Sequence, residues 1–225
     1  MKPDPAHISA HRRLETRCCL QHWGAGSGLQ RCRHTPAYER RSQRSVVCCS
    51  LEPGVRRLIL MRHADSEVGD RAAVRDHERP ITESGRASAQ QVAVKLQQKG
   101  WLPDLIVCSN SVRTRQTLEQ MRAVVRAFQA AVTHFRGSLY TVAALDGQMM
   151  RYLQKCIAEE AGELQASTVM CLSHNKGIQE AASGFHGQPI RLETANAALL
   201  EGRGDTWEEA LASSWQLVDI LTPET

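Results

Sequence analysis

Short apolar runs alternate with amphipathic segments from about residue 56 to the end of the chain. The runs at 57–61, 104–108 and 168–172 consist largely of aliphatic residues and are too short for helices, so we predict that they form buried strands. Two later segments, at 196–200 and 215–220, are also predicted to be strands. One of these two is expected at the edge of the sheet.

Between the strands, apolar residues recur at helical spacing. We predict four helices, at about 82–99, 111–130, 146–161 and 177–182. The first has Thr82 as a typical N-cap and Gly100 as its stop. The second is expected to turn one face to the core, formed by Leu118, Met121, Val125 and Phe128. Strands that alternate with helices are typical of a three-layer α/β/α sandwich with a largely parallel central sheet.

Residues 1–50 differ in composition from the rest of the chain. They contain nine Lys/Arg against three Asp/Glu, whereas the remainder contains nineteen against twenty-one. This basic segment is poor in acids, contains Arg and Ser, and lacks hydrophobic periodicity, which is typical of an organelle transit peptide. We therefore predict a disordered transit-peptide-like segment at 1–50 and one folded domain at 55–223. Chloroplast and mitochondrion are both open as destinations, with chloroplast favoured.

The same composition bears on partners and on metal binding. Because the positive charge belongs to the tail, it gives no reason to expect nucleic-acid binding by the domain. No stretch approaches the roughly 18 apolar residues of a transmembrane helix, so no membrane partner is expected. Five of the eight cysteines lie in residues 1–50, near His34. A zinc site or redox switch is thus the alternative for this segment, although it contains no C-x-x-C pair.

Three cysteines lie in the predicted domain: Cys108, Cys156 and Cys171. Two of them fall within predicted strands, where buried reduced thiols are ordinary core residues. We therefore expect these cysteines to serve packing rather than chemistry.

Polar side chains follow three of the predicted strands at the point where each strand ends. These residues are Arg62 and His63, then Ser109 and Arg113, then His174 and Asn175. Because the carboxyl ends of parallel strands meet at one edge of a sheet, we expect two histidines and two or more arginines to converge there. Arginine binds phosphate oxygens bidentately, and a helix N-terminus near Arg113 adds backbone donors. The sequence therefore predicts a phosphoryl-transfer site.

In these residues the chain resembles the histidine phosphatase (phosphoglycerate mutase-like) superfamily, and most of all its short bacterial-type phosphohistidine phosphatases. Three family motifs, Arg-His-Gly, Ser-x-x-x-Arg-Ala-x-x-Thr and Gly-His-Asn, are matched by Arg62-His63-Ala64, by Ser109 to Thr117, and by Ser173-His174-Asn175. The segment Arg79-Pro80-Ile81-Thr82, followed by Gly85, is similar to the Arg-Pro-Leu-Thr segment of short members. Four segments in this order make a much more specific signal than any one of them.

The resemblance implies a role for each matched residue. His63 would be the nucleophile that forms a transient phosphohistidine. Arg62, Arg113 and His174 would hold the phosphoryl oxygens and stabilise the transition state. To attack, His63 needs one unprotonated ring nitrogen, and a backbone carbonyl at the other would fix the tautomer. The expected substrate-binding residues are Arg79, Asn175 and Ser109. The resemblance implies no metal and no cofactor.

Two departures from the family motifs matter. Ala64 stands where the motif has glycine, and alanine adopts left-handed backbone angles poorly, so the loop must adjust if that glycine serves conformation. Ser173 also replaces a glycine, and this small-for-small change is expected to be harmless. An alkyl phosphate further needs a general acid, for which the nearby candidates are Asp65, Glu67, Asp76, Glu78 and Glu83.

Three functions follow from these observations. The favoured one is a histidine-dependent phosphatase acting on a phosphohistidine protein or a small phosphorylated metabolite. A phosphoglycerate mutase-type phosphoryl transferase is less favoured, because a mutase calls for an enclosing lid and no long insertion follows the second strand. A phosphate-binding module without turnover is the third, supported by Ala64 and by the lack of a clear general acid. A phosphoramidate such as phosphohistidine has a better leaving group and could dispense with that acid.

Overall fold

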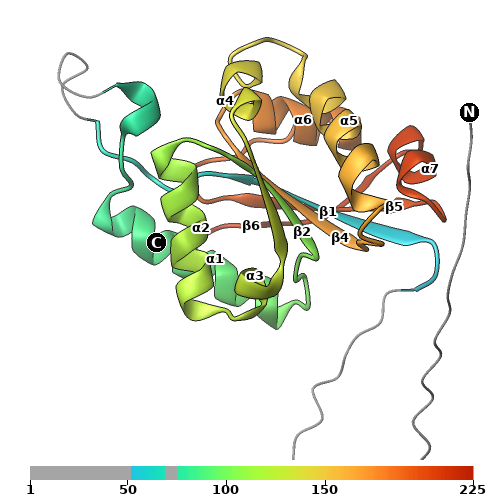
Figure 1. Cartoon of the computed structure of the whole chain (residues 1–225), viewed down its shortest axis with the longest axis horizontal. Coiled ribbons are helices and arrows are strands. Elements are labelled where there is room, and N and C mark those ends of the chain that lie inside the picture. The colour runs from blue at the N-terminus through green and yellow to red at the C-terminus, as the bar shows by residue number, and fades with distance from the viewer. Residues whose placement is uncertain (1–51, 69–74, 225) are drawn as a thin grey trace, which may run out of the picture. The chain divides into compact units, whose positions relative to one another are not determined.

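Six strands form one sheet in the computed structural model, which describes residues 52–68 and 75–224 (Figure 1). The strands are β1 (Val55–Arg62), β2 (Leu105–Ser109), β3 (Val132–Arg136), β4 (Thr168–Ser173), β5 (Ala197–Arg203) and β6 (Gln216–Leu221). The predicted transit-peptide-like segment at 1–50 lies outside the described residues.

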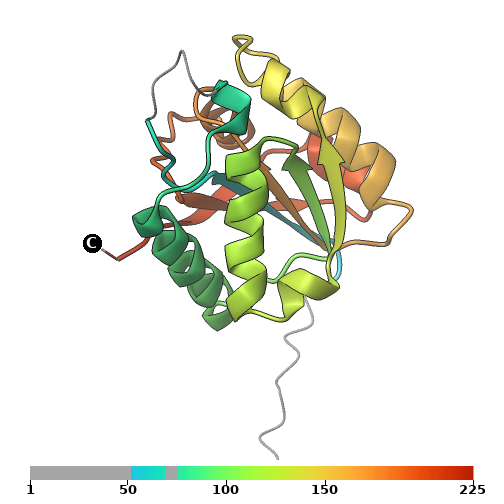
Figure 2. The same cartoon turned by 60° about the vertical axis from the view of Figure 1, so that its left-hand side comes forward.

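Helices cover both faces of this sheet. They are α1 (Glu83–Gln98), α2 (Val112–Val124), α3 (Ala127–Ala130), α4 (Ser138–Val142), α5 (Met149–Ala161), α6 (Gly177–His186) and α7 (Trp207–Ala212), with a 3-10 helix η1 (Asp76–Glu78). Figure 2 shows α1 and α2 side by side on one face. None of the helices in the described residues is long and apolar enough to span a membrane.

The strand order is β3-β2-β4-β1-β5-β6, and the four strands from β3 to β1 are parallel. Only β5 runs the other way, antiparallel to both β1 and β6. The prediction of a largely parallel sheet between helical layers is therefore confirmed, with β6 as the predicted edge strand. The parallel strands β1, β2 and β4 end at the same edge, where β1 and β4 pair Arg62 with Ser173.

Alternation along β1 divides the core into two halves. Leu58 and Leu60 pack with α5 and α6, whereas Ile59 and Met61 pack with α1 and α2. Successive side chains of a strand point to opposite faces, so a continuous apolar run is what a strand covered on both sides requires. This arrangement buries Leu58 to Met61 completely, and Arg62 and His63 follow at the C-terminal end of the strand.

The predicted helix at 111–130 is interrupted. It divides at Val125, whose backbone is extended (φ −127°, ψ 109°), into α2 and α3. The side chain of Arg122 donates to the carbonyl of Phe128 (3.1 Å), and Gln129 donates back to the carbonyl of Arg122 (2.9 Å). These side-chain hydrogen bonds replace helical ones, and the break still lets Val125 and Phe128 reach the core.

Other boundaries also differ from the predicted ones. Strand β3 and the short helices α4 and α7 were not predicted, because β3 is a half-exposed edge strand and the two helices are too short for a clear period. Helix α5 begins at Met149 rather than at 146, after a turn in which Gly147 has a φ of +69°. Helix α6 continues beyond the predicted end at 182, to His186.

The three cysteines of the described residues are reduced and buried, as expected. Cys108 lies in β2 and Cys171 in β4, and burial raises the pKa of the Cys108 thiol to about 12.

Near the C-terminus, Trp207 and Trp215 stack with their ring centroids 6.1 Å apart and pack the last segments onto the sheet.

Candidate active site

The imidazole of His63 lies directly after β1 and is held by backbone groups. Its amide donates to the carbonyl of Ser173 (3.0 Å), which continues the pairing between β1 and β4. Its Nδ1 lies 2.7 Å from the carbonyl oxygen of Ala64. A carbonyl can only accept, so Nδ1 carries the proton and Nε2 keeps its lone pair. This is the tautomer that a nucleophilic histidine requires.

The surroundings of His63 keep it neutral. Burial lowers its pKa to about 4, and the positive charges of Arg113 and Arg62 act in the same direction, against the opposing effect of the Ala64 carbonyl. At neutral pH the imidazole is therefore free of a second proton and able to attack an electrophile.

Arg113 lies in the first turn of α2, and its guanidinium reaches His63. Its Nε donates to Nε2 of His63 over 3.2 Å, and the side chain is buried. Thr117, one turn further on, accepts from the amide of Ala64 (3.0 Å) and donates to the carbonyl of Arg113 (2.7 Å). The threonine of the motif thus ties α2 to the loop that carries the nucleophile.

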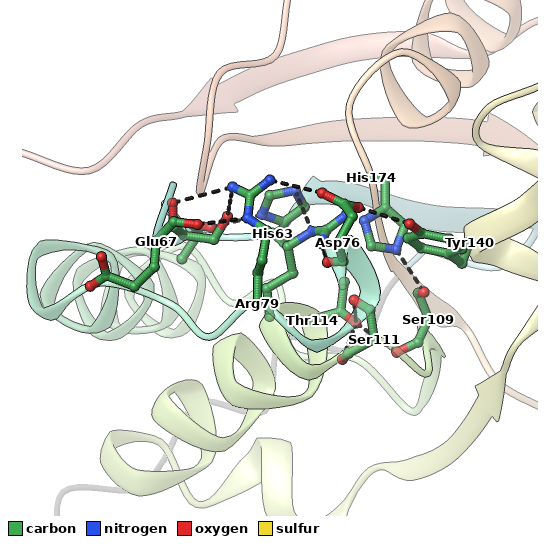
Figure 3. Close-up of polar contacts among 12 residues, drawn as sticks. His63, Glu67, Asp76, Arg79, Ser109, Ser111, Thr114, Tyr140 and His174 are labelled. Carbon is green, nitrogen blue, oxygen red and sulfur yellow. Dashed lines mark hydrogen bonds and ion pairs between the residues drawn. The ribbon is translucent and has the colours of Figure 1, made fainter. Parts of the chain in front are cut away.

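His174 follows β4 and faces His63, with their ring centroids 5.4 Å apart (Figure 3). Its Nε2 is 2.8 Å from the hydroxyl of Ser109, whereas its Nδ1 is buried without a partner among the described residues. Burial lowers the pKa of His174 to about 3, and the charge of Arg113 adds to the effect. His174 therefore presents one unused polar nitrogen in a neutral ring.

Arg62 is the last residue of β1. Its Nη1 donates to the carbonyl of Leu192 (3.1 Å), and its Nε is buried without a partner in the described part of the chain. Burial lowers the pKa of this guanidinium. Arg62 and Asn175 together line a hollow of about 400 Å³ beside the strand ends. An anion would satisfy the free donor of Arg62.

Two of the predicted substrate-binding residues are occupied by internal contacts. Arg79 donates from Nε to the carbonyl of Glu67 (2.6 Å), from Nη1 to Asp76 (2.8 Å) and from Nη2 to the hydroxyl of Ser66 (2.9 Å). Ser109 is fully buried against His174. Both residues organise their neighbours in this structure, and direct contact with a substrate stays a prediction for them.

Among the five candidate acids, Asp76 is the one whose carboxylate touches the arginine beside His63. Its Oδ2 accepts from Nη2 of Arg113 (2.9 Å) and from the hydroxyl of Tyr140 (2.8 Å). Burial opposes ionisation, but the hydrogen bonds from Tyr140 and Arg113 outweigh it and lower the pKa of Asp76 to about 2. In Figure 3 the carboxylate of Glu67 points away from His63.

The sequence did not identify Tyr140 as part of this site. The residue lies in α4, after the unpredicted strand β3, and its ring packs edge-on against His174 with a centroid distance of 5.1 Å. The Arg113 guanidinium lies 5.7 Å from the centre of the same ring. No local pattern marks such a residue, because only the path of the chain through β3 brings it to the pocket.

Ala64 does not adopt a left-handed backbone. In the described residues, positive φ among non-glycine residues is confined to Gln165 and Ala195. The methyl group of Ala64 is completely buried in the core half that faces α1 and α2. Alanine therefore fits this position of the motif without a left-handed backbone.

Comparison with known proteins places these features in a family. Residues 58–136 match the model of the histidine phosphatase superfamily (branch 1). An uncharacterized chloroplastic protein of Arabidopsis thaliana is 47% identical over 174 residues, which cover 76% of this chain and 79% of that protein. A candidate phosphohistidine phosphatase, SixA from Nakamurella multipartitia, has a structure that aligns with a TM-score of 0.62 at 26% identity, over 76% of this chain and 98% of that one.

A further solved structure shares the fold at lower identity. The mycobacterial glucosyl-3-phosphoglycerate phosphatase aligns with a TM-score of 0.52 at 17% identity, over 76% of this chain and the whole of that chain. The same architecture therefore occurs in an enzyme named for a small phosphate ester.

Proposed function

This chain belongs to the histidine phosphatase superfamily, and we propose that it hydrolyses a phosphorylated substrate through a covalent phosphohistidine on His63. One observation carries the proposal. The Nδ1 of His63 is bonded to the Ala64 carbonyl, while Nε2 keeps its lone pair 3.2 Å from the Arg113 guanidinium. A nucleophile of fixed tautomer beside a cation is the arrangement that in-line attack on a phosphoryl group needs.

The reaction then has two displacements. In the first, Nε2 of His63 forms a bond to phosphorus while the bond from phosphorus to the leaving group breaks. The Nδ1–H of the resulting imidazolium stays bonded to the Ala64 carbonyl, which stabilises its positive charge. In the second, water attacks phosphorus, the P–N bond breaks, and inorganic phosphate leaves with His63 neutral again. Arg62, Arg113 and His174 stabilise the negative charge on the phosphoryl oxygens in both steps.

The state of Asp76 favours a phosphohistidine protein over an alkyl phosphate as substrate. An alkoxide leaving group needs a proton from a nearby acid. The carboxylate beside Arg113 is ionised, with a pKa of about 2, and so has no proton to give at neutral pH. The imidazole of a phosphohistidine leaves without that assistance. A small phosphate ester is the alternative substrate.

The other two functions have less support. A mutase calls for an enclosing lid, but in the described residues only two residues separate the end of β2 at Ser109 from the start of α2 at Val112. A phosphate-binding module without turnover was supported by Ala64 and by the lack of a clear general acid. Ala64 no longer supports it, because this residue does not adopt a positive φ.

A turnover assay tests the proposal. The full chain is incubated with a phosphohistidine protein, with p-nitrophenyl phosphate and with a phosphorylated metabolite such as 3-phosphoglycerate. We expect hydrolysis that His63→Ala abolishes and that His134→Gln, on the edge strand β3, leaves intact. Tight phosphate binding without hydrolysis would instead indicate a binding module. Transfer between positions of one metabolite, faster than its hydrolysis, would indicate a mutase.

We also propose that residues 1–50 direct the protein to the chloroplast and that the phosphatase domain spans 55–223. The basic composition of the first fifty residues and the chloroplastic relative support this. The test is a fusion of residues 1–50 to a fluorescent protein, followed by imaging and by sequencing of the processed N-terminus. Fluorescence in mitochondria or in the cytosol would contradict the proposal.

A further inference from the structure

The carboxylate of Asp76 joins three segments that are far apart in the sequence. It belongs to η1, and it accepts from Arg113 of α2 (2.9 Å), from Tyr140 of α4 (2.8 Å) and from Arg79 of the following loop (2.8 Å). Figure 3 shows Asp76, Arg79 and Tyr140 beside His63 and His174. Such a set of charged donors holds a carboxylate firmly, because each bond is charge-assisted or supported by its neighbours.

Asp76 also determines where the guanidinium of Arg113 can lie. Nε of Arg113 points to Nε2 of His63, whereas Nη2 donates to the Asp76 carboxylate and Nη1 to the Asp76 carbonyl. Within the described residues, Asp76 provides every acceptor that the two terminal nitrogens have. An arginine side chain has many rotamers and loses considerable entropy when fixed, so this contact orders it before any substrate binds.

We propose that Asp76 is a positioning residue, which holds the guanidinium of Arg113 against the nucleophilic nitrogen of His63, with Tyr140 and Arg79 bracing its carboxylate. The catalytic meaning of this contact rests on the proposed phosphatase function. The contact excludes Asp76 as general acid, since a carboxylate that accepts three hydrogen bonds, two of them from guanidinium groups and one from a hydroxyl, has no reason to carry a proton.

The charges around His63 predict in which direction its pKa changes if Asp76 acts through Arg113. The cations that face the imidazole are Arg62 at the end of β1, Arg113 of α2 and Arg79, while the ring of His174 after β4 is neutral. Direct loss of the Asp76 charge would make the surroundings more positive and lower the pKa of His63. Release of Arg113 from its place beside His63 would remove a cation and raise that pKa. The two effects have opposite signs, so a variant of Asp76 distinguishes them.

The experiment compares the full chain with Asp76→Ala, Tyr140→Phe and Glu119→Ala. Glu119 is a matched control, because it is an exposed acid of α2, the helix that carries Arg113. Each protein is labelled with ¹³C at histidine Cε1, the His63 resonance is assigned with His63→Gln, and it is titrated by NMR. Turnover is measured on the same samples as kcat, KM and the pH dependence of kcat/KM.

We expect Asp76→Ala to raise the pKa of His63 by about one pH unit, in line with the effect of one neighbouring charge. Its kcat should fall about 10- to 100-fold, as for other losses of alignment, with a smaller change in KM. Tyr140→Phe should change both quantities in the same direction but less, and Glu119→Ala should change neither. Because Tyr140→Phe keeps the ring against His174, it also serves if Asp76→Ala fails to fold.

A lower or unchanged pKa of His63 in both Asp76→Ala and Tyr140→Phe would overturn the inference. An unchanged kcat in both would do so as well. Failure of the proposed function has a different signature. In that case the wild-type chain would not hydrolyse any phosphorylated substrate, although the NMR titration would still report whether Asp76 holds Arg113 beside His63.

Discussion

The Nδ1 of His63 lies 2.7 Å from the carbonyl oxygen of Ala64, the next residue of the chain. The protonation of the nucleophile is thus fixed by a backbone group at the end of a buried strand, which no side-chain substitution removes. The same burial keeps the ring neutral, because a low-dielectric site disfavours the imidazolium.

The neutral state of His63 should extend far into the acid range. Its pKa of about 4 predicts that kcat/KM loses activity through protonation of the nucleophile only below about pH 5. The measurement is a pH profile of kcat/KM with p-nitrophenyl phosphate, at each pH for which circular dichroism shows the folded chain. An acid limb centred near 6.5, the value of an unperturbed histidine, would contradict the buried and neutral nucleophile.

The same pKa shift predicts how the stability depends on pH. In the native state His63 stays neutral down to about pH 4, whereas in the unfolded chain it takes up a proton below about 6.5. Unfolding therefore binds protons in this window, and the free energy of unfolding decreases as the pH falls from 6.5 to 4, by about 3 kcal/mol from His63.

Urea unfolding at several pH values checks this dependence. We expect His63→Gln to show a flatter decline in stability between pH 7 and pH 4 than the wild-type chain. His174, whose pKa of about 3 is also depressed by burial, adds a decline of the same sign. Equal slopes for the variant and the wild type would show that His63 titrates alike in both states.

Ser109→Ala should impair both stability and catalysis. The hydroxyl is the partner of Nε2 of His174, whose Nδ1 already lacks one in the described residues. Its removal leaves a buried ring without either hydrogen bond, which costs about 1–3 kcal/mol in free energy of unfolding. We also expect a lower kcat, because the ring loses its fixed orientation. The exposed Ser214→Ala is a control that should change neither quantity.

Ala64→Gly should restore the family motif without improving the enzyme. Ala64 does not adopt a positive φ, and its buried methyl group contributes to the core. We expect kcat to stay within about twofold and the free energy of unfolding to fall by about 1 kcal/mol. A large gain in kcat would show that the alanine restrains the loop.

Gly85→Ala should be strongly destabilising, because here, unlike at position 64, glycine is required. A Cβ at Gly85 would collide with the backbone carbonyl of Asp65, so this glycine is required by space. We expect a marked loss of stability, measured by urea unfolding beside Ala64→Gly. If Gly85→Ala were as stable as the wild-type chain, the close approach of α1 to the loop after β1 would be wrong.

The sequence was informative wherever a residue's place follows from its neighbours along the chain. The apolar run of β1 and the N-cap Thr82, whose hydroxyl accepts from the amide of Gly85, are local features and were predicted. Edge strand β3 was not predicted, because its sequence of Val, Thr, His, Phe and Arg has no continuous apolar run. This mixture suits a strand whose side chains are half-buried or exposed. The break at Val125 depends on hydrogen bonds of Arg122 and Gln129, which a periodic pattern does not record.

In the candidate site, too, the residues of local motifs were predicted, whereas residues brought together by the fold were not. Motif order indicated which histidines and arginines follow the strands, and the structure places His63, Arg113 and His174 together, with Arg62 beside them. The choice of Asp76 among five nearby acids needed the position of Tyr140, sixty-four residues away in the chain. Whether Ala64 needs a left-handed backbone also required the structure, because φ at a strand end depends on the surrounding pairings and not on residue type alone.

The two strand cysteines can report local unfolding of the strands beneath the site. Cys108 immediately precedes Ser109 in β2, and Cys171 lies two residues before Ser173 in β4, so both thiols lie in the strands that position His174. Buried thiols with a raised pKa do not react with alkylating reagents until the strand around them separates. The rate at which each cysteine becomes alkylated, measured by peptide mass spectrometry, therefore reports how often β2 and β4 unfold locally under native conditions.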